Sequence, residues 1–373
     1  MRCAYGVWDY IKNRAPERER AANWAIHWIG MYPGKRENRR FVGDYTLTQN
    51  DIEYGGRFDD TVAFGGWTMD DHHPAGMLYP EAPTIHHPAP SPYGIPYRCL
   101  YSENIGNLFF AGRNISVTHA ALSSTRVMAT CAVIGQAVGT ASALCTRYAC
   151  APRTLYKQHL ELLQETLQDD DCFLPGFRRS PWGAAHEAKL ETPGEGSERL
   201  LNGIERDRDA SSNAWEGDLN TPIAYTWNTP ISIGGIRLVF DSNLNNDKRM
   251  PCSYPVKTSG KALPVSLVRA FRIEVRNSSD RWETVYRDDE NRRRLVEVPV
   301  NATTDGIRLI PEATWGSAKV RIFAFEPTES YLGKIPEIPD GASFAEIRAA
   351  QDPNDLRPPA KGSREITPAG NTA

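Results

Sequence analysis

The sequence carries little net charge and no paired cysteine motif. Its 43 lysines and arginines nearly balance 46 aspartates and glutamates, giving a formal net charge of −3. A surface that binds nucleic acid or an anionic membrane needs an excess of positive charge, so neither partner is expected. The seven cysteines are scattered without a Cys-x-x-Cys pair. That spacing argues against a zinc site or a disulfide scaffold, and we expect no metal.

The sequence also lacks a Gly-x-Gly-x-x-Gly turn, the pattern with which many α/β proteins bind the pyrophosphate of a dinucleotide. The adjacent glycines at 55–56, 65–66 and 234–235 do not fit its spacing. No secretory signal is visible at the first residues. We therefore leave the compartment open: cytoplasmic, or periplasmic or extracellular if a signal was lost with an N-terminal part.

The most informative stretch runs from Asn107 to Gly139. It predicts an apolar strand from Leu108 to Ala111, a glycine, a polar loop, and a helix from near Ser123 to Leu144. Strand, glycine and helix in this order bring backbone N–H groups and the positive end of a helix dipole to an electron-rich ligand. The unit alone is ordinary α/β architecture. The loop nevertheless carries more polar side chains than a packing connector needs, which favours a cofactor contact.

The helix after this loop raises a second question, because Val127 to Leu144 is apolar enough for a membrane span. It includes several polar residues, and no other segment of comparable hydrophobicity accompanies it. We therefore predict a buried core helix and no membrane partner. Gly135, Gly139 and Ala143 recur every fourth residue, so they share one face that lets another backbone approach closely.

Several blocks in this part of the chain follow one another in a fixed order. They are Lys35-Arg-Glu-Asn-Arg-Arg40, Gly43-Asp-Tyr-Thr-Leu-Thr48, Phe58-Asp-Asp-Thr-Val-Ala-Phe-Gly-Gly66, Asp70-Asp-His-His-Pro74, Tyr93-Gly-Ile-Pro-Tyr-Arg98, Leu108-Phe-Phe-Ala-Gly-Arg-Asn-Ile-Ser116 and Ser124-Thr-Arg-Val-Met-Ala-Thr130. Through them, roughly residues 20 to 148 resemble the bacterial FAD-dependent oxidoreductases of the glutathione-reductase-like superfamily. The resemblance implies part of an α/β flavoprotein fold, FAD as cofactor, and hydride transfer from a small-molecule substrate.

The resemblance also assigns residues to the cofactor. The block at 111–116 would lie along the ribityl and pyrophosphate part of FAD, and the helix starting near Ser124 would point its N-terminus at the pyrimidine edge of the flavin. The cofactor-binding residues implied are Gly112, Arg113, Asn114, Ile115, Ser116, Ser124, Thr125, Arg126 and Val127. We expect Arg126 in the first turn of that helix, where a cation opposes the dipole unless an anion such as FAD compensates. A salt bridge to a carboxylate is the alternative.

The sequence departs from such enzymes in one respect. They begin with a strand and the Gly-x-Gly-x-x-Gly turn that binds the ADP half of FAD, and this chain has no such motif. We therefore expect a C-terminal portion of the enzyme, with a separate chain carrying the missing half as a candidate partner. We also expect the chain alone to bind FAD weakly or not at all.

Three further groups are candidates for the chemistry. His119 follows the cofactor loop and could move a proton while hydride goes to the flavin, although a histidine bound to backbone is an equal alternative. Arg36 and Arg40 could hold an anionic substrate, with Arg40 expected to be buried. His72 is expected near the substrate pocket. The adjacent histidines at 72–73 and 86–87 point in different directions on any regular element, which disfavours a metal site.

The domain organisation follows from composition and period. We predict helical structure over residues 1 to 30, few regular elements from 32 to 106, and a helix from Pro152 to about Gln168. Residues 1–174 would form the oxidoreductase part, 175–208 a linker, 209–327 an all-β jelly-roll sandwich, and 328–373 a disordered tail. The sandwich resembles discoidin-like, galactose-binding-like domains through Ile236-Arg-Leu-Val-Phe-Asp241, Phe271-Arg-Ile-Glu-Val275 and Thr314-Trp-Gly316.

The tryptophans of the predicted sandwich raise an alternative function. Trp215 and Trp227 lie in turn-like sequence and could stack on a sugar, although aromatic residues of a small sandwich mostly fill its core. The substrate could then be carbohydrate-related. The alternative to an oxidoreductase is a non-catalytic carbohydrate-binding or scaffolding protein that keeps a degenerate flavoprotein half.

Overall fold

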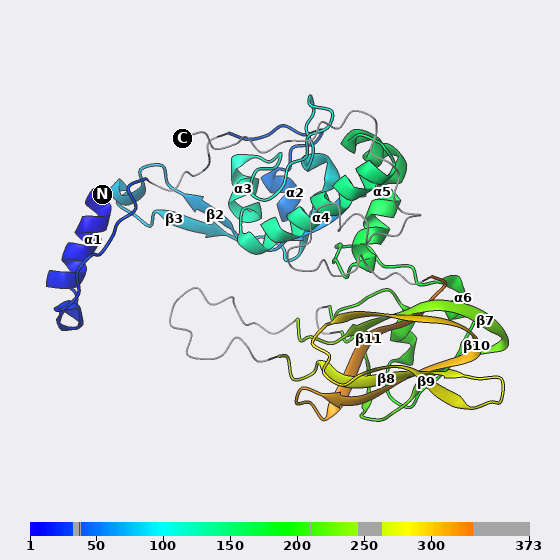
Figure 1. The fold of residues 1–373 in the computed structure, drawn as a ribbon. Helices are drawn as coiled ribbons and strands as arrows, with labels where there is room; N and C mark the ends of the chain where they lie inside the picture. The colour runs from blue at the N-terminus through cyan, green and yellow to red at the C-terminus, as the bar shows by residue number, and fades with distance from the viewer. Residues whose placement is uncertain (33–36, 38, 209–210, 245–262, 331–373) are drawn as a thin grey trace, which may run out of the picture. The chain divides into compact units, whose positions relative to one another are not determined.

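The computed structural model describes residues 1–32, 37, 39–208, 211–244 and 263–330 (Figure 1). The chain divides into two compact units, Met1–Phe41 and Val42–Ala373. The second unit contains an α/β part and an all-β part. Most of the segment predicted to be a disordered tail, residues 331–373, lies outside the described residues.

The first unit holds two short helices in place of the helical stretch predicted over residues 1 to 30. α1 spans Arg2–Asn13, the 3-10 helix η1 spans Arg18–Ala21, and no helix or strand follows through residue 32. Lys12 Nζ donates three hydrogen bonds, of 2.8 to 3.1 Å, to backbone oxygens at the end of η1 and just beyond it. The apolar pattern that suggested more helix comes from surface residues, since Trp24 and Trp28 are 70% and 77% exposed.

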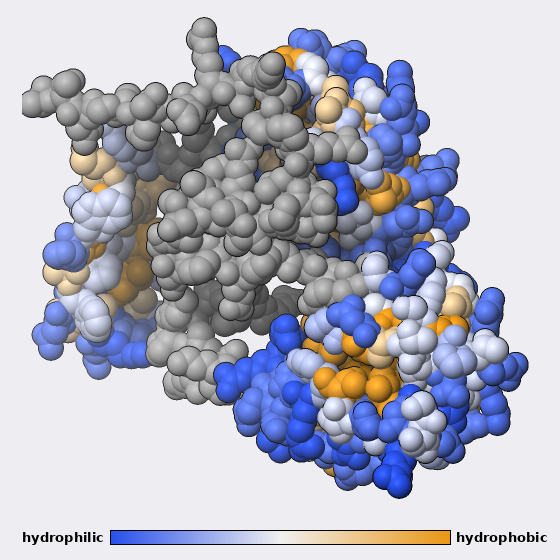
Figure 2. Space-filling view, turned by 45° about the vertical axis from the view of Figure 1, so that its right-hand side comes forward, coloured by the Kyte–Doolittle hydropathy of each residue, from blue (hydrophilic) through white to orange (hydrophobic). Residues whose placement is uncertain are grey.

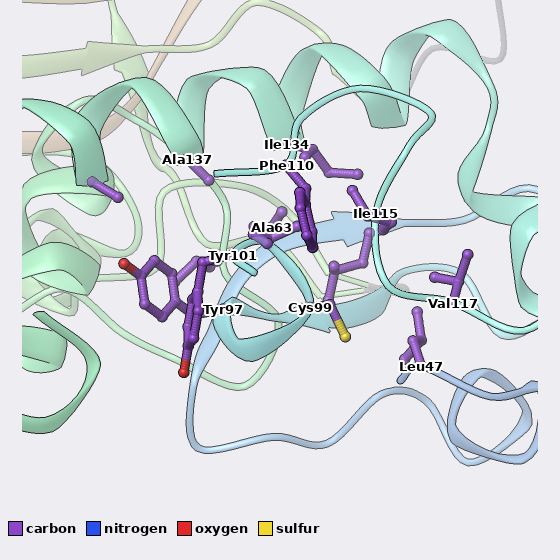
Figure 3. Close-up of a cluster of buried hydrophobic side chains, with 14 of the residues drawn as sticks. Leu47, Ala63, Tyr97, Cys99, Tyr101, Phe110, Ile115, Val117, Ile134 and Ala137 are labelled. Atoms are coloured by element: carbon purple, nitrogen blue, oxygen red, sulfur yellow. The ribbon is translucent and has the colours of Figure 1, made fainter. Parts of the chain in front are cut away.

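The α/β part is built on a two-stranded antiparallel sheet packed against helices. β1 (Thr61–Gly65) pairs with β4 (Tyr93–Pro96), and α4 (Met128–Arg147) packs on β1 and on α5 (Pro152–Asp169). Gly65 allows the strands to approach, because a Cβ there would lie 2.3 Å from the hydroxyl oxygen of Tyr93. Figure 3 shows the hydrophobic core of this part, which includes Tyr97, Cys99, Phe110, Ile134 and Ala137.

Short elements precede and flank this sheet. α2 (Gln49–Glu53) begins at a capping box of Thr48 and Asp51, and β2 (Met69–His72) pairs with β3 (Thr84–His87). Two 3-10 helices, η2 (Gly76–Leu78) and η3 (Tyr97–Cys99), complete the region. The sequence predicted few regular elements from 32 to 106, and within that range the structure places α2 and the four short strands β1 to β4.

The junction between cofactor loop and helix differs from the prediction. Phe109 forms only an isolated bridge with Tyr101, so the described chain has no strand at 108–111. The single predicted helix is two helices, α3 (His119–Thr125) and α4, because Val127 adopts extended backbone angles (φ −71°, ψ 148°). Helix α3 starts four residues before the predicted position, since Thr118 accepts a hydrogen bond from the N–H of Ala121 and caps it.

The predicted helix after Pro152 is confirmed as α5, with Pro152 in its first turn. The following segment is more structured than the predicted linker. It contains α6 (Gly183–His186), β5 (Lys189–Glu191) and the 3-10 helix η4 (Ser197–Leu201). β5 pairs with β7 of the sandwich, and Leu200 is fully buried in the sandwich core. These elements therefore pack with the all-β part.

The all-β part is an antiparallel sandwich, as predicted. β6 (Trp215–Asp218), β11 (Lys319–Thr328), β7 (Ile223–Phe240), β10 (Leu295–Thr314), β8 (Val268–Arg276) and β9 (Trp282–Asp288) neighbour one another in that order. Irregularities in register between Pro299 and Ala302 and between Thr304 and Gly306 interrupt the long pairing of β10 with β7. Such bulges bend strands, which lets them contribute to both layers.

The tryptophans singled out as sugar platforms belong to the core of the sandwich. Trp215 is fully buried and Trp227 is 7% exposed, with its indole N–H donating to the Ala184 oxygen. This prediction was wrong, because turn-like residues nearby in the sequence do not indicate which side chains of the strands point into the core.

Figure 2 shows that hydrophobic residues gather in one area of the lower body on the visible face, among mainly polar surroundings.

Arginines of the sandwich meet the end of α5. Arg237 of β7 is fully buried and donates to the backbone oxygens of Asp169 (3.0 Å) and Gln168 (3.1 Å), and its guanidinium pairs with Glu205. Arg294 Nε lies 2.6 Å from Asp171 Oδ2. The last carbonyls of a helix have no partner within it and carry the negative end of the dipole, so cations are favoured there.

Candidate cofactor and substrate site

The loop predicted to contact the cofactor has one side in the core. Ile115 and Ser116 are buried, and Ser116 Oγ lies 3.2 Å from Thr46 Oγ1. The backbone of the loop is fixed by a parallel bridge between Leu47 and Val117. The side chains of Ile115 and Ser116 are therefore engaged within the protein. The backbone of Ser116 is engaged as well, because its N–H donates to Cys99 O (3.0 Å) and its oxygen accepts from Leu47 N (3.0 Å).

The outer side of the loop is more accessible. Gly112 has a φ of +68°, in the left-handed region that favours glycine. Arg113 is partly exposed and Asn114 is exposed. Burial raises the pKa of the Cys131 thiol, and the positive charge of Arg113 acts in the opposite direction. Arg113 is thus close enough to the first turns of α4 to influence a group on that helix.

The start of α4 has no side-chain cap. Its N-cap is Val127, whose side chain accepts no hydrogen bond, so the N–H groups of the first turn are left for another acceptor. Thr125 lies immediately before this turn and is 1% exposed, and among the described residues its Oγ1 has no hydrogen-bond partner. A buried hydroxyl without a partner costs free energy, so a partner of another kind is expected.

Ser124 has a different role from the one predicted. Its Oγ donates to the Trp67 backbone oxygen (2.6 Å) and lies 2.6 Å from the hydroxyl oxygen of Tyr93, which must then donate to it. Both side chains are fully buried, and burial raises the pKa of Tyr93 to about 12. Ser124 therefore fastens α3 to β4 and to the turn before β2. No local pattern in the sequence indicates that Tyr93 contacts Ser124.

Arg126 ends α3 as its C-cap, so its predicted place in the first turn of the long helix was wrong. A cation at the C-terminal end of a helix is stabilised by the dipole. Arg126 Nη2 lies 2.8 Å from His72 Nε2, and His72 Nδ1 lies 2.9 Å from Thr84 Oγ1. The structure thus joins a residue predicted for the cofactor with one predicted for the substrate.

Asp70 lies near this pair, with its backbone oxygen 3.4 Å from Arg126 Nη2. The sequence pointed to Asp70 only as part of the block Asp70-Asp-His-His-Pro74. Burial by itself would raise its pKa, but hydrogen bonds from Thr68, Trp67 and His86 outweigh that effect and lower it to about 2. Its Oδ1 lies 2.7 Å from His86 Nδ1. Asp70 and His86 are direct partners in the register of β2 and β3, so recognising the hairpin would have found the pair.

His119 lies at the opposite end of α3 from Arg126. It is the first residue of the helix, and its side chain is exposed. Seven residues of α-helix rise about 10 Å. A proton-transfer role for His119 and a substrate role for His72 therefore need a substrate region that extends along α3.

Of the two predicted substrate arginines, Arg36 is outside the described residues. Arg40 belongs to the first unit, pairs with Glu37, and has a side chain that is 41% exposed. The expectation that Arg40 is buried was wrong.

The described residues fit one half of FAD better than the other. Uncapped N–H groups, the hydroxyl of Thr125 and the charge of Arg113 suit the electron-rich end of the flavin. No glycine-rich turn for the ADP half occurs among the described residues.

In the same residues, no group of three or more potential ligands is placed to hold a metal ion. One described helix, α4, is long and apolar enough to cross a membrane, a property that core helices share.

Comparison with known families bears on the first 167 residues. Residues 2–167 match the model of the FAD dependent oxidoreductase family. This segment, which is less than half of the chain, is therefore similar in sequence to FAD-dependent oxidoreductases. FAD is the cofactor of the matched family. No curated protein matched the chain.

Solved structures similar to this chain include carbohydrate-binding modules. One is the family 32 module of Streptococcus pneumoniae EndoD, with 15% identity, a TM-score of 0.30, and coverage of 39% of this chain and 98% of the module. Another is the family 32 module of C. perfringens NanJ in complex with galactose, with 11% identity, a TM-score of 0.27, and coverage of 38% and 94%. At these scores nothing about ligand or activity follows for this chain.

Proposed function

We propose that this chain supplies the flavin-facing part of an FAD-dependent oxidoreductase that removes hydride from a small-molecule or carbohydrate-related substrate. One observation carries the proposal. The uncapped start of α4 at Val127 coincides with the buried, unpartnered hydroxyl of Thr125. Both features need an acceptor-rich ligand that the described protein does not provide, and a flavin edge is such a ligand.

Each residue near this turn has a role in the proposal. The N–H groups of the first turn of α4 and the guanidinium of Arg113 stabilise negative charge, and Thr125 Oγ1 donates to the same ligand. When bound, FAD accepts the hydride. A sugar-like alcohol loses that hydride from carbon and a proton from oxygen, and it becomes a carbonyl compound. His119 is the proposed acceptor of the proton, because its side chain is exposed at the start of α3.

His72 is the weaker candidate for the proton. An arginine N–H can only donate, so His72 Nε2 accepts from Arg126 and the ring proton sits on Nδ1, facing Thr84. Both ring nitrogens are occupied in this arrangement. His72 and Arg126 are better suited to positioning a substrate.

The proposal includes a second chain that carries the ADP-binding half. In the α/β part of the second unit, the described large hydrophobic side chains that are exposed are Val42, Tyr54, Trp67, Leu78, Ile85, Ile105, Leu108, Met128 and Tyr148. The exposed positions on α4 include Met128, Gly135 and Gly139, and a Cβ at either glycine would meet nothing within 4 Å. An apolar surface of this kind is usually covered by a partner.

The test replaces the hydroxyl of Thr125 by a methyl group. Thr125→Val should weaken flavin binding by about tenfold, because it removes one hydrogen bond to a ligand that carries negative charge. It should leave the free energy of unfolding unchanged or raise it, since the hydroxyl has no protein partner to lose. The matched control is Thr146→Val, on the exposed face near the other end of α4.

Two results would count against the proposal. One is equal flavin affinity for Thr125→Val, Thr146→Val and the unchanged chain, measured by flavin fluorescence. The other is no flavin binding by any of them at saturating concentration, which favours the alternative of a non-catalytic carbohydrate-binding or scaffolding protein. The purified protein would then lack a flavin absorption band under all loading conditions.

A further inference from the structure

The C-terminal end of α4 brings two cysteines together. Cys150 N donates to Cys145 O (2.9 Å), and Ala149 N donates to Thr146 O (3.3 Å). Ala149 has a φ of +49°. This pair of hydrogen bonds, closed by a left-handed residue, is the Schellman motif, in which the first residue after the left-handed one contacts the last turn of the helix. Here the two contacting residues are both cysteines.

The same geometry brings the two side chains together. Cys145 and Cys150 occupy the two positions of the Schellman motif whose side chains commonly pack on each other, and both are half-buried free thiols. Burial, together with the Cys150 thiol, raises the pKa of Cys145 to about 12. Packing alone requires only two small apolar groups at these positions. Two neighbouring thiols, at a site with partial access to solvent, can also be oxidised to one disulfide.

We propose that Cys145 and Cys150 form a reversible thiol–disulfide pair that closes the turn between α4 and α5. The oxidant is a small-molecule disulfide such as oxidised glutathione. One protein thiolate attacks it and releases one reduced glutathione, and the mixed disulfide is then attacked by the second protein sulfur, which releases another. Two protein thiols are oxidised, one glutathione disulfide is reduced to two thiols, and the protons pass to the departing sulfurs.

A flavin at the other end of α4 cannot be the direct oxidant. Cys145 lies 17 residues after Met128, which corresponds to about 26 Å along an α-helix. Electron-pair transfer to a flavin needs the sulfur in contact with the ring. The cysteine pair is therefore independent of the proposed oxidoreductase function, and a separate experiment tests it.

The chain is well suited to that test, because trypsin cleaves after Arg147, between the two cysteines. The full-length protein is incubated with oxidised glutathione, free thiols are alkylated, and the digest is examined by mass spectrometry without reductant. We expect peptide 127–147 joined to peptide 148–153, and the pair should separate with dithiothreitol. The linked form should exceed the glutathione adducts of either cysteine by at least about tenfold, because a neighbouring thiol acts at a high effective concentration.

Three cysteines serve as controls. Cys3 is exposed, and its glutathione adduct shows that the oxidant was active. Cys131→Ser should keep the linked peptides, which excludes the other cysteine of peptide 127–147. Cys145→Ser should abolish the link and leave a glutathione adduct on Cys150. If Cys3 is modified in the folded protein while Cys145 and Cys150 are recovered only as separate alkylated or glutathione-modified residues, the proposal is wrong.

Discussion

Arg126 Nη2 and His72 Nε2 are 2.8 Å apart, although the two residues are 54 positions apart in the sequence. The contact fastens the C-terminal end of α3 to the hairpin of β2 and β3. Arg126 Nη2 also approaches the Asp70 backbone oxygen (3.4 Å). The break between α3 and α4 and the position of the hairpin are therefore set by the same guanidinium.

Replacing Arg126 tests this relationship. In Arg126→Ala, His72 loses the donor that keeps its ring proton on Nδ1, so nitrogen NMR should show a mixture of tautomers in place of one. In the FAD-loaded enzyme the same variant should retain less FAD or show a lower flavin reduction potential, because a nearby cation is removed. Unchanged occupancy and potential would make Arg126 a purely structural residue.

Ser124 should matter more for stability than its partner Tyr93. Ser124→Ala leaves two buried groups without partners, the Trp67 oxygen and the Tyr93 hydroxyl, and should lower the free energy of unfolding by about 2–4 kcal/mol. Tyr93→Phe leaves the bond from Ser124 to Trp67 intact and should cost about 1 kcal/mol. Urea denaturation of both variants measures the two losses of unfolding free energy and shows which one is larger. A larger cost for Tyr93→Phe would contradict the hydrogen-bond directions assigned here.

Asp70 should contribute to stability in a pH-dependent way. Its folded pKa is lowered from an ordinary value of 3.8 to about 2, so the ionised form is favoured by folding. The stabilisation is fully present above about pH 4 and is lost as the pH falls through about 2. The difference in stability between the unchanged protein and Asp70→Asn should therefore shrink over that window. A constant difference would show that the three hydrogen bonds to Asp70 do not favour its charge.

A chain ending at residue 170 should self-associate. It would keep the exposed hydrophobic residues of the α/β part and would lose Arg237, which donates to the last carbonyls of α5. Gel filtration should show aggregates or broad elution where the full chain elutes in one peak. A monodisperse fragment that melts cooperatively would contradict the proposal that a second chain covers the exposed apolar side chains of the α/β part.

Much of the fold follows from local patterns in the sequence. Pro152 marks the start of α5, and the alternation in Ile236-Arg-Leu-Val-Phe240 and Val320-Arg-Ile-Phe-Ala-Phe325 marks strands of the sandwich. These signals succeed because capping and side-chain alternation involve residues close together in the sequence.

The site was harder to predict because distant contacts define it. The segment Ser124-Thr-Arg-Val-Met128 contains no glycine or proline that would predict an interruption between α3 and α4. The break coincides with hydrogen bonds from Ser124 to Trp67 and from Arg126 to Asp70 and His72, all more than 50 residues away.

The most direct test of the account compares how this chain binds FAD, FMN and ADP. In the proposed function the described residues contact the flavin end of FAD, and they include no glycine-rich turn for the ADP end. We therefore expect weak binding, FAD and FMN affinities within about threefold of each other, and no competition by ADP, since the adenine half adds no contacts. Stoichiometric FAD that survives gel filtration and is displaced by ADP would contradict the account.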